Sequence, residues 1–349
     1  MNFLTIIIIV VIVFAGIILW SFFAKPKSKP QLESIYTEAL NALIRGEQNT
    51  AVELLRQVVK QDSNHVNAYL QLGNILRKDH TDQAIKIHQS LTVRPNLSKQ
   101  MNVEIHQSLA LDFEKAGRLE KAKQEAEQIL NIERRNRWAI EFLLKIAAEE
   151  RKWTEAMRLA KMIQRIEGAQ DVTQLARYQV YEGLDYLSND DWKNARISFN
   201  KAVKTDPDFG LPFLHLGNLA EADRDLGKAI DYWEKFVYRD PDENTRVFHK
   251  VESALFDMGR FGEVEKFYRR ILERFPDNLD ALAKLAGVLE EKGEHQEALN
   301  LVERALGRHD DSIQLKLMKL KFSVSSQQPH ELARQIDGII SNLPTKDSN

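Results

Sequence analysis

Cysteine is absent from this chain of 349 residues, and that absence excludes a disulfide framework, a thiolate zinc site and a cysteine nucleophile. Glycine and proline are scarce, with 15 and 9 residues, which excludes collagen-like and flexible low-complexity segments and favours a helical chain. An excess of one charge is also lacking. The formal net charge is only −2, so the composition does not indicate a nucleic-acid partner.

Catalytic motifs are missing as well. The chain has no strand followed by GxGxxG, no GxxxxGK[ST], no HExxH and no GxSxG, and its nine histidines are scattered rather than paired at metal-ligand spacing. We therefore predict no enzyme activity, no catalytic residue, no cofactor and no metal. The acidic groups Asp190–Asp191 and DPDEN at 240–244 carry oxygen ligands suited to calcium, but both lie at expected turns, so we favour turn chemistry.

The basic run ERRNR at 133–137 lies at an expected helix boundary. Basic residues at such a boundary usually form a solvated face, and we interpret the run in that way. Contact with a phosphate or a lipid headgroup is the alternative.

The N-terminal segment holds 22 mostly apolar residues, Phe3 to Ala24, with no charged side chain before Lys25. At about 1.5 Å per residue, a helix over this run is long enough to cross a hydrocarbon core of about 30 Å. A cleaved signal peptide is the alternative, but it needs a basic start, a shorter apolar core and small residues at a cleavage site. We predict a transmembrane anchor at residues 1–24.

A basic linker follows the predicted anchor. Lys25, Lys27 and Lys29 come directly after the apolar run, so the positive-inside rule places the bulk of the chain in the cytoplasm and predicts a single-pass inner-membrane protein. Pro26 and Pro30 discourage helix continuation, which makes residues 25–31 a short stiff connector.

An internal repeat organises the rest of the chain. Three stretches align: GLDYLSNDDWKNARISFNKAVKTDP from Gly183, GNLAEADRDLGKAIDYWEKFVYRDP from Gly217 and AGVLEEKGEHQEALNLVERALGRHD from Ala286. In each, a small residue is followed twelve positions later by alanine and sixteen positions later by Phe, Trp or Val. Small residues where the helices of a hairpin touch, with large ones between hairpins, are typical of tetratricopeptide repeats.

The repeat spacing predicts the fold class. Four of the seven spacings equal 34 residues, and units begin near residues 32, 66, 103, 137, 176, 210, 245 and 279. We predict an all-α tetratricopeptide-repeat superhelical solenoid preceded by one N-terminal transmembrane helix. About eight repeats occupy residues 32–311, and C-terminal capping helices with a tail occupy residues 312–349.

Two histidines fall in the second unit, within YLQLGNILRKDHTDQAIKIHQSL at 69–91, and raise the possibility of a ligand site. His88 aligns with Ala126, Phe199 and Trp233, a packing position between helices, once one missing residue in the turn is allowed for. We predict that His88 lies in the core and that His80 lies in a solvated turn.

The concave face of the solenoid is the expected binding surface, lined by positions 2, 5, 9 and 12 of each first helix. Asparagine can bind backbone groups, arginine pairs with carboxylates, and Leu or Phe accepts apolar side chains, so we expect an extended or helical peptide as ligand. Packing against a neighbouring helix is the alternative for several of them. The candidate groove residues are Leu70, Asn74, Arg77, Leu184, Leu187, Leu211, Leu214, Asn218, Arg246, His249 and Phe256.

One phrase carries a family resemblance. LGNILRKDHTDQAIKIHQSLTVRPNLS, from Leu72, together with the uncharged N-terminal span and the basic linker, resembles lipopolysaccharide assembly protein B of Gram-negative bacteria. That family has a similar Leu-Gly-Asn stretch leading into Ala-Ile-x-Ile-His-Gln, which is matched here at residues 84–89. The segment WTEAMRLAKMIQRIEG at 153–168 is also similar, and the resemblance covers about residues 1–343. The family usually ends in a rubredoxin-like zinc module with two CxxC pairs, which this cysteine-free chain does not contain, so we expect a shortened relative or a paralogue.

The resemblance implies a membrane-anchored cytoplasmic adaptor. Such a protein links lipid A precursor synthesis to lipopolysaccharide export and helps a membrane AAA+ protease to degrade a lipid A biosynthetic enzyme. The implied partners are that protease and lipid A biosynthetic or lipopolysaccharide export proteins, bound through the concave repeat face. A generic membrane-tethered scaffold for another envelope process, such as secretion, pilus or complex assembly, remains the alternative.

Overall fold

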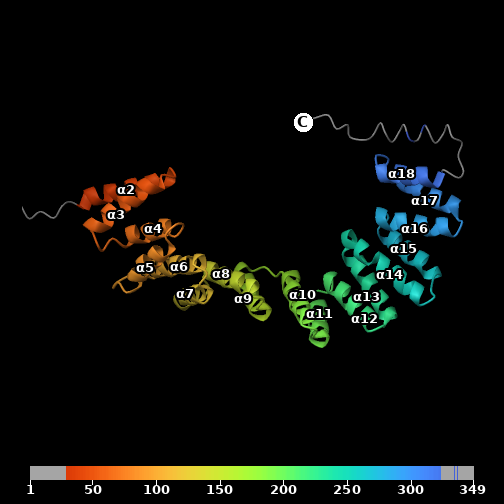
Figure 1. Cartoon of the computed structure of the whole chain (residues 1–349), viewed down its shortest axis with the longest axis horizontal. Helices are drawn as coiled ribbons and strands as arrows, with labels where there is room; N and C mark the ends of the chain where they lie inside the picture. The colour runs from red at the N-terminus through yellow and green to blue at the C-terminus, as the bar shows by residue number, and fades with distance from the viewer. Residues whose placement is uncertain (1–28, 324–333, 335, 337–349) are drawn as a thin grey trace, which may run out of the picture. The chain divides into compact units, whose positions relative to one another are not determined.

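The computed structural model describes residues 29–323, 334 and 336 (Figure 1). The predicted transmembrane span at 3–24 and most of the predicted linker lie outside these residues. Within the part of the chain that is described, no helix is both long enough and apolar enough to cross a membrane. Contacts divide the chain into two compact units, Met1–Gly168 (unit 1) and Ala169–Asn349 (unit 2).

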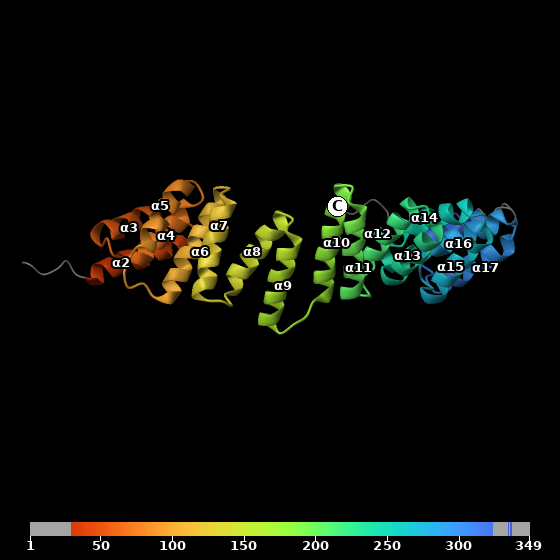
Figure 2. The ribbon, with the colours of Figure 1, turned by 90° about the horizontal axis from the view of Figure 1, so that it is seen from below.

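Unit 1 contains four described helical hairpins, repeats one to four, which Figure 2 shows in chain order. Their helices are α2 (Lys29–Ile44) and α3 (Gln48–Gln61), α4 (Val66–Leu76) and α5 (Thr81–Thr92), α6 (Lys99–Lys115) and α7 (Leu119–Ile132), and α8 (Arg137–Glu149) and α9 (Trp153–Glu167). The last residues of the predicted connector at 25–31 are therefore helical rather than extended. Proline is tolerated there because the first turn of a helix needs no backbone N–H donor.

Unit 2 contains repeats five to eight and one more helix. The helices are α10 (Val172–Ser188) and α11 (Trp192–Thr205), α12 (Leu211–Ala222) and α13 (Leu226–Arg239), α14 (Thr245–Asp257) and α15 (Gly262–Arg274), α16 (Leu279–Glu291) and α17 (His295–Leu306), and α18 (Ile313–Ser323). A short 3₁₀ helix, η1 (Pro241–Glu243), precedes α14. The described residues form no strand, which confirms the predicted all-α solenoid class.

The turns inside the hairpins share one backbone feature. Seven hairpins place a residue of positive φ fifteenth from the repeat start, namely Gly46, Gly117, Arg151, Asp190, Arg224, Gly259 and Gly293. A left-handed residue after a helix satisfies the carbonyls of its last turn and reverses the chain. Repeat two has no such residue in its α4–α5 turn, in agreement with the one residue that its sequence lacks there.

Close packing inside each hairpin depends on a small residue opposite a large one. A Cβ added to Gly217 would lie 2.4 Å from the ring of Trp233, and one added to Gly183 would lie 2.4 Å from the ring of Phe199. Both rings are fully buried. The glycines are therefore needed to let the second helix of the hairpin approach the first, as the repeat alignment predicts.

Candidate protein-interaction surface

A buried charged network joins repeats two and three in unit 1. Asp112 on α6 is 0% exposed, and its Oδ1 accepts a hydrogen bond from Arg77 Nε at 2.6 Å. Its other oxygen, Oδ2, lies 2.6 Å from His88 Nδ1 on α5. One carboxylate therefore bridges the end of α4, the middle of α5 and the next repeat.

Asn74 and Ser108 complete the network. Arg77 Nη2 donates to Asn74 Oδ1 at 2.6 Å and to the Ser108 carbonyl at 3.2 Å. The Ser108 hydroxyl also donates to Asn74 Oδ1, at 3.1 Å. Two predicted groove residues, Asn74 and Arg77, are thus brought together, and both already bind groups of their own chain. Their contact with a partner stays a prediction.

His88 lies in the core, as predicted, with 0% exposure. Its Nε2 lies 3.1 Å from the Leu70 carbonyl, and a Cβ added to Gly73 would lie only 2.3 Å from the same nitrogen. The absence of a side chain at Gly73 therefore makes room for the ring. His80, also as predicted, is exposed at the start of α5.

The sequence did not identify Asp112 as the partner of His88. The two residues are 24 positions apart, and they belong to different repeats. The available signal was an acidic residue inside the otherwise apolar stretch LALDF at 109–113. A buried carboxylate needs a cation or several donors, so this position could have been paired with His88 or Arg77.

Two of the predicted groove leucines are interior residues. Leu70 is 4% exposed and Leu214 is 3% exposed, so neither offers surface to a partner, and the prediction is wrong for both. Leu214 packs in the main core of unit 2. Helix periodicity does not report how closely a neighbouring helix covers a given position.

Four further candidates are half-buried in unit 2. Leu184, Leu187 and Leu211 pack against the apolar cluster around Phe199. Asn218 Oδ1 accepts a hydrogen bond from Trp233 Nε1 at 3.2 Å, which orients the buried indole. Each of the four has a packing or bonding role within the repeats.

The remaining candidates, Arg246, His249 and Phe256, are exposed along α14. Arg246 Nη1 lies 3.6 Å from Glu243, and its guanidinium lies 5.9 Å from the ring centre of Phe236. His249 has one weak contact, 3.9 Å from Nδ1 to Glu252. Of the predicted groove residues, these three are the exposed ones.

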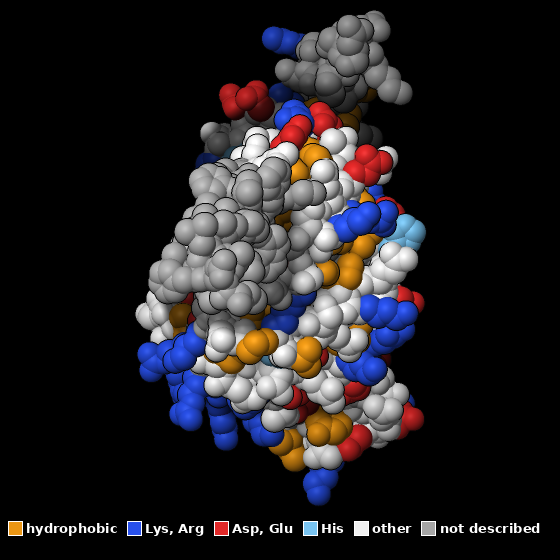
Figure 3. All heavy atoms as spheres, turned by 90° about the vertical axis from the view of Figure 1, so that its left-hand side faces the viewer, with side chains coloured by type: hydrophobic (Ala, Val, Ile, Leu, Met, Phe, Trp, Pro, Cys, Tyr) orange, Lys and Arg blue, Asp and Glu red, His pale blue; other side chains and the backbone are white. Residues whose placement is uncertain are grey.

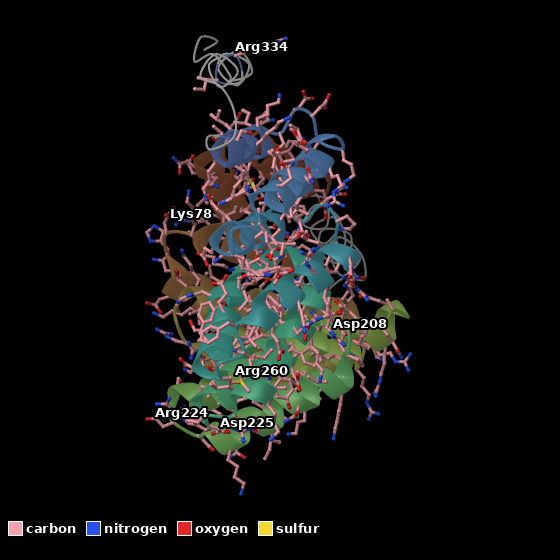
Figure 4. All side chains as sticks on the ribbon, turned by 90° about the vertical axis from the view of Figure 1, so that its right-hand side faces the viewer. Lys78, Asp208, Arg224, Asp225, Arg260 and Arg334 are labelled. Carbon is pink, nitrogen blue, oxygen red and sulfur yellow. The ribbon has the colours of Figure 1, made fainter. Side chains whose placement is uncertain are left out.

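Phe256 lines an apolar cavity of about 450 Å³. The cavity lies beside the α14–α15 turn and α16, and its walls are Phe256, Phe261, Gly262, Val264, Val288, Glu291 and Lys292. Figure 4 labels Arg260, which lies in this turn, and Arg224 and Asp225, which lie in the α12–α13 turn. We call the space at the α14–α15 turn the repeat-seven cavity.

Unit 1 has a hollow of different character, with a volume of about 370 Å³. Polar and charged side chains dominate its lining, which comprises Gln48, Asn49, Val52, Glu53, Arg56, Ile75, Leu76, Asp79 and His80. Figure 3 shows one face of the molecule on which, where residues are described, basic and acidic side chains are interspersed and apolar patches are small. The lining of the hollow in unit 1 is more polar than that of the repeat-seven cavity.

His215 on α12 lies near one of the exposed groove candidates, Arg246 on α14. Its ring stacks on Phe199, with 5.1 Å between ring centres. Burial, together with the positive charge of Arg246, lowers the pKa of His215 to about 4. The imidazole is therefore neutral at pH 7 and does not add a positive charge next to Arg246.

Residues of the acidic and basic runs cap helices and form ion pairs within the chain. Asp191 caps α11 by accepting a hydrogen bond from the Asn194 N–H at 3.1 Å, and the side-chain and backbone donors of Asn194 lower its pKa. In the run ERRNR, Asn136 caps α8, and Arg137 binds Glu141 at 2.6 Å and Glu167 at 2.7 Å. In the described part of the chain, no group of three or more His, Asp or Glu side chains is placed to hold a metal ion.

Comparison with known proteins agrees with the repeat architecture. A family model described as "Tetratricopeptide repeat" matches residues 255–321, and one described as "Domain of unknown function (DUF7017)" matches residues 34–169. The first match agrees with the eight described hairpins, which form an all-helical solenoid of the tetratricopeptide-like class.

Two similar proteins that share one name cover most of this chain. The chain is 24% identical to lipopolysaccharide assembly protein B of Escherichia coli K12 over 280 residues, which are 80% of this chain and 72% of that protein. Its identity to the protein of the same name from Haemophilus influenzae is 24% over 272 residues, covering 75% and 68%. These matches confirm the resemblance predicted from the sequence: the chain is similar to lipopolysaccharide assembly protein B over most of its length.

Solved repeat proteins are also similar, at low sequence identity. The peptide-binding repeat protein YrrB is 17% identical, with a TM-score of 0.37 over 54% of this chain and 91% of that one. The TPR2AB domain of yeast Sti1, in complex with pHSP90, is 14% identical, with a TM-score of 0.33 over 90% of this chain and 99% of that one.

Proposed function

We propose that this chain is an inner-membrane-anchored cytoplasmic adaptor that regulates lipopolysaccharide (lipid A) synthesis and assembly by binding other proteins. The observation that carries the proposal is the similarity to lipopolysaccharide assembly protein B over 80% of the chain. Tetratricopeptide hairpins support it, because stacked repeats provide extended surfaces for binding proteins.

The proposed anchor is the apolar run at residues 3–24, with Lys25, Lys27 and Lys29 on the cytoplasmic side. A tether confines the repeats to the membrane surface and so raises their effective concentration near membrane proteins. Modest affinity at each contact is then sufficient for a stable complex. The bulk of the chain is cytoplasmic in this proposal.

The proposed partners are proteins rather than small substrates or nucleic acid. They include a membrane AAA+ protease and lipid A biosynthetic or lipopolysaccharide export proteins, with the adaptor presenting a biosynthetic enzyme to the protease. The proposed contact surface comprises the exposed groove candidates Arg246, His249 and Phe256. Catalysis is assigned to the partners and not to this chain.

Quantitative affinity capture tests the proposal. The full-length chain is recovered from detergent-solubilised Gram-negative membranes, and co-purifying proteins are measured against a chain that carries residues 1–31 alone. We expect the protease and lipid A enzymes to be enriched only with the full chain. Recovery of secretion or pilus components instead would favour a generic envelope scaffold and overturn the lipopolysaccharide assignment.

Orientation is tested separately with reporters fused after Asn349. We expect a cytoplasm-dependent reporter to be active and a periplasm-dependent reporter to be silent. The reverse pattern would overturn the cytoplasmic placement without affecting the repeat fold.

A further inference from the structure

Position twelve of the first helix links one repeat to the next in half of the eight repeats. In four repeats the residue at this position is charged and forms an ion pair with the following helix pair. These pairs are Arg77–Asp112 at 2.6 Å, Glu114–Lys145 at 2.9 Å, Glu221–Lys250 at 2.8 Å and Glu290–Lys321 at 2.8 Å.

In the other four repeats position twelve is apolar, and among those residues Phe256 of repeat seven is the exposed one, whereas Leu43, Ala148 and Leu187 are half-buried. The Phe256 side chain is 49% exposed, and it contacts the ring of Phe261, which is 63% exposed, at 5.5 Å between ring centres. Burying a phenylalanine side chain stabilises a fold, and these two rings forgo much of that stabilisation. Their placement does little for the fold and leaves an apolar surface open.

The cavity beside these rings has the size and lining of a ligand site. Its volume is about 450 Å³, within the range of about 300–1,000 Å³ that small ligand pockets occupy. Val264 and Val288 add apolar walls, and Met258, two residues after Phe256 in the chain, is also exposed. Such a space accepts one large apolar side chain from outside.

The charged residues at the edge of the cavity determine which neighbouring residue of a bound peptide is favoured. Lys292 is neutralised by Glu265 at 2.6 Å and Glu294 at 2.8 Å. Glu291, which also lines the cavity, is exposed and forms no ion pair with any described residue. The rim therefore offers one carboxylate to an incoming cation and no uncompensated positive charge.

We propose that the repeat-seven cavity is an anchor site for a peptide segment of a protein partner in which a large apolar side chain, Leu or Phe, is followed by Lys or Arg. The apolar side chain fills the cavity between Phe256, Phe261 and Val288, and the basic side chain pairs with Glu291. The inference rests on the proposed adaptor function, and it adds the site and the chemistry of the segment that is bound.

Two matched display libraries test the site on the full-length chain in detergent. Both consist of random peptides of equal length, with Phe-Lys at the centre of one and Phe-Glu at the centre of the other. We expect binders from the Phe-Lys library, with dissociation constants that rise at least tenfold for the variant F256E/F261E. In E291K the preference should reverse in favour of Phe-Glu.

Trp192 supplies the matched control. It occupies the same repeat position as Phe261, is 43% exposed and lies outside the cavity. W192E should bind the selected peptides as the native chain does. If F256E/F261E loses helical circular dichroism, F256A is assayed in its place, and an unchanged affinity in either folded variant overturns the anchor site.

The chain's own C-terminal segment is the rival occupant. Residues 330–343 carry apolar residues at helical spacing, and Ile336, one of the two described residues there, is exposed. If I336D raises peptide affinity, this segment competes for the cavity, and a partner peptide as the native occupant is overturned. An unchanged affinity supports the proposal.

Membrane capture in parallel separates the two proposals. If the native chain captures lipopolysaccharide proteins and F256E/F261E captures them equally well, the anchor site is wrong and the adaptor function stands. If the selected peptides bind at Phe256 while the native chain captures none of those proteins, the anchor site stands and the lipopolysaccharide assignment is wrong.

Discussion

Repeats two and seven use the same helical position in opposite ways. In unit 1, Arg77 is held by Asp112 at 2.6 Å, and its guanidinium is committed to the next repeat. In unit 2, Phe256 makes no such link and lines an open apolar cavity. The two residues therefore share a repeat position but differ in side-chain type. The charged side chain binds its own chain, and the apolar side chain remains accessible.

The cavities of the two units show the same contrast. The hollow in unit 1 is lined mainly by polar side chains such as Glu53, Arg56 and Asp79, which water can solvate. The repeat-seven cavity is lined mainly by Phe and Val side chains, from which displaced water yields free energy. Unit 2 is therefore better suited to hold an apolar anchor, whereas unit 1 holds the buried charged network around Asp112.

The largest effect is expected from D112N. The substitution removes the carboxylate charge that faces Arg77 and His88, and breaking a buried ion pair costs about 3–5 kcal/mol. Hydrogen–deuterium exchange should show faster exchange in peptides from α4 to α6, and the free energy of unfolding of unit 1 should fall by about 3 kcal/mol.

The matched control is E114Q. Glu114 lies in α6, as Asp112 does, and the substitution removes its partly exposed ion pair with Lys145 of α8. We expect a loss below about 1 kcal/mol, because exposed pairs contribute little. Equal losses in D112N and E114Q would contradict the distinction between a buried network and a surface pair.

Gly73 in unit 1 and Gly287 in unit 2 differ in how closely neighbouring side chains pack against them. An alanine Cβ at Gly73 would lie 2.3 Å from His88 Nε2, whereas a Cβ at Gly287 would meet nothing within 4 Å. We expect G73A to lower the free energy of unfolding by about 2 kcal/mol through overpacking. G287A should raise it by about 0.5–1 kcal/mol, because alanine favours the helix. Chemical denaturation of both variants gives the signs, and a stabilising G73A would show that His88 can move aside.

His215 predicts a pH dependence that belongs to unit 2. Its folded pKa of about 4 lies below the ordinary value of 6.5, because burial and Arg246 disfavour the charged ring. Between these two pH values the unfolded chain binds more protons, so this stabilising contribution is complete above pH 6.5 and is lost as the pH falls to 4.

Replacement by phenylalanine removes the titrating ring and keeps a ring against Phe199. In H215F the decline in stability of unit 2 between pH 6.5 and 4 should be smaller by about 1–2 kcal/mol, a value reduced for partial solvent exposure. Exchange rates of α12 peptides, measured across this range, provide the comparison. Identical pH profiles would mean that His215 is solvated.

The smallest stability effect is expected at the repeat-seven cavity. F256E changes an exposed side chain, so the free energy of unfolding should change by less than about 0.5 kcal/mol. Thermal unfolding of F256E and D112N side by side measures the contrast. A loss at Phe256 comparable to that at Asp112 would show that the aromatic pair stabilises the fold and is not held open for a partner.

The sequence predicted much of the fold because each repeat carries its own periodic signal. The small and large residues at Gly217 and Trp233, or Gly73 and His88, specify close helix contacts that the structure contains. The site was harder to predict. Asp112 was missed because its partners lie in another repeat, and Leu70 and Leu214 were misassigned because periodicity does not report coverage by a neighbouring helix.

Phe261 was also missed as a surface residue. It lies in a turn, where the aromatic residues Trp153 and Trp192 occupy the same position of other repeats, and this recurrence does not indicate an exposed binding residue. Its exposure and its contact with Phe256 depend on the way in which α14, α15 and α16 meet. The repeat pattern identifies helices and turns, but it does not specify how these three helices pack against one another.

Site-specific photocrosslinking tests the central claim most directly. A photoreactive phenylalanine analogue is placed at position 256 and, as a matched control, at position 192 in the full-length chain, and crosslinked proteins are identified after irradiation of living Gram-negative cells. We predict crosslinks at 256, and not at 192, to proteins of lipopolysaccharide synthesis or export. Equal crosslinking at both positions, or none at 256, would contradict the account of repeat seven as the protein-binding site.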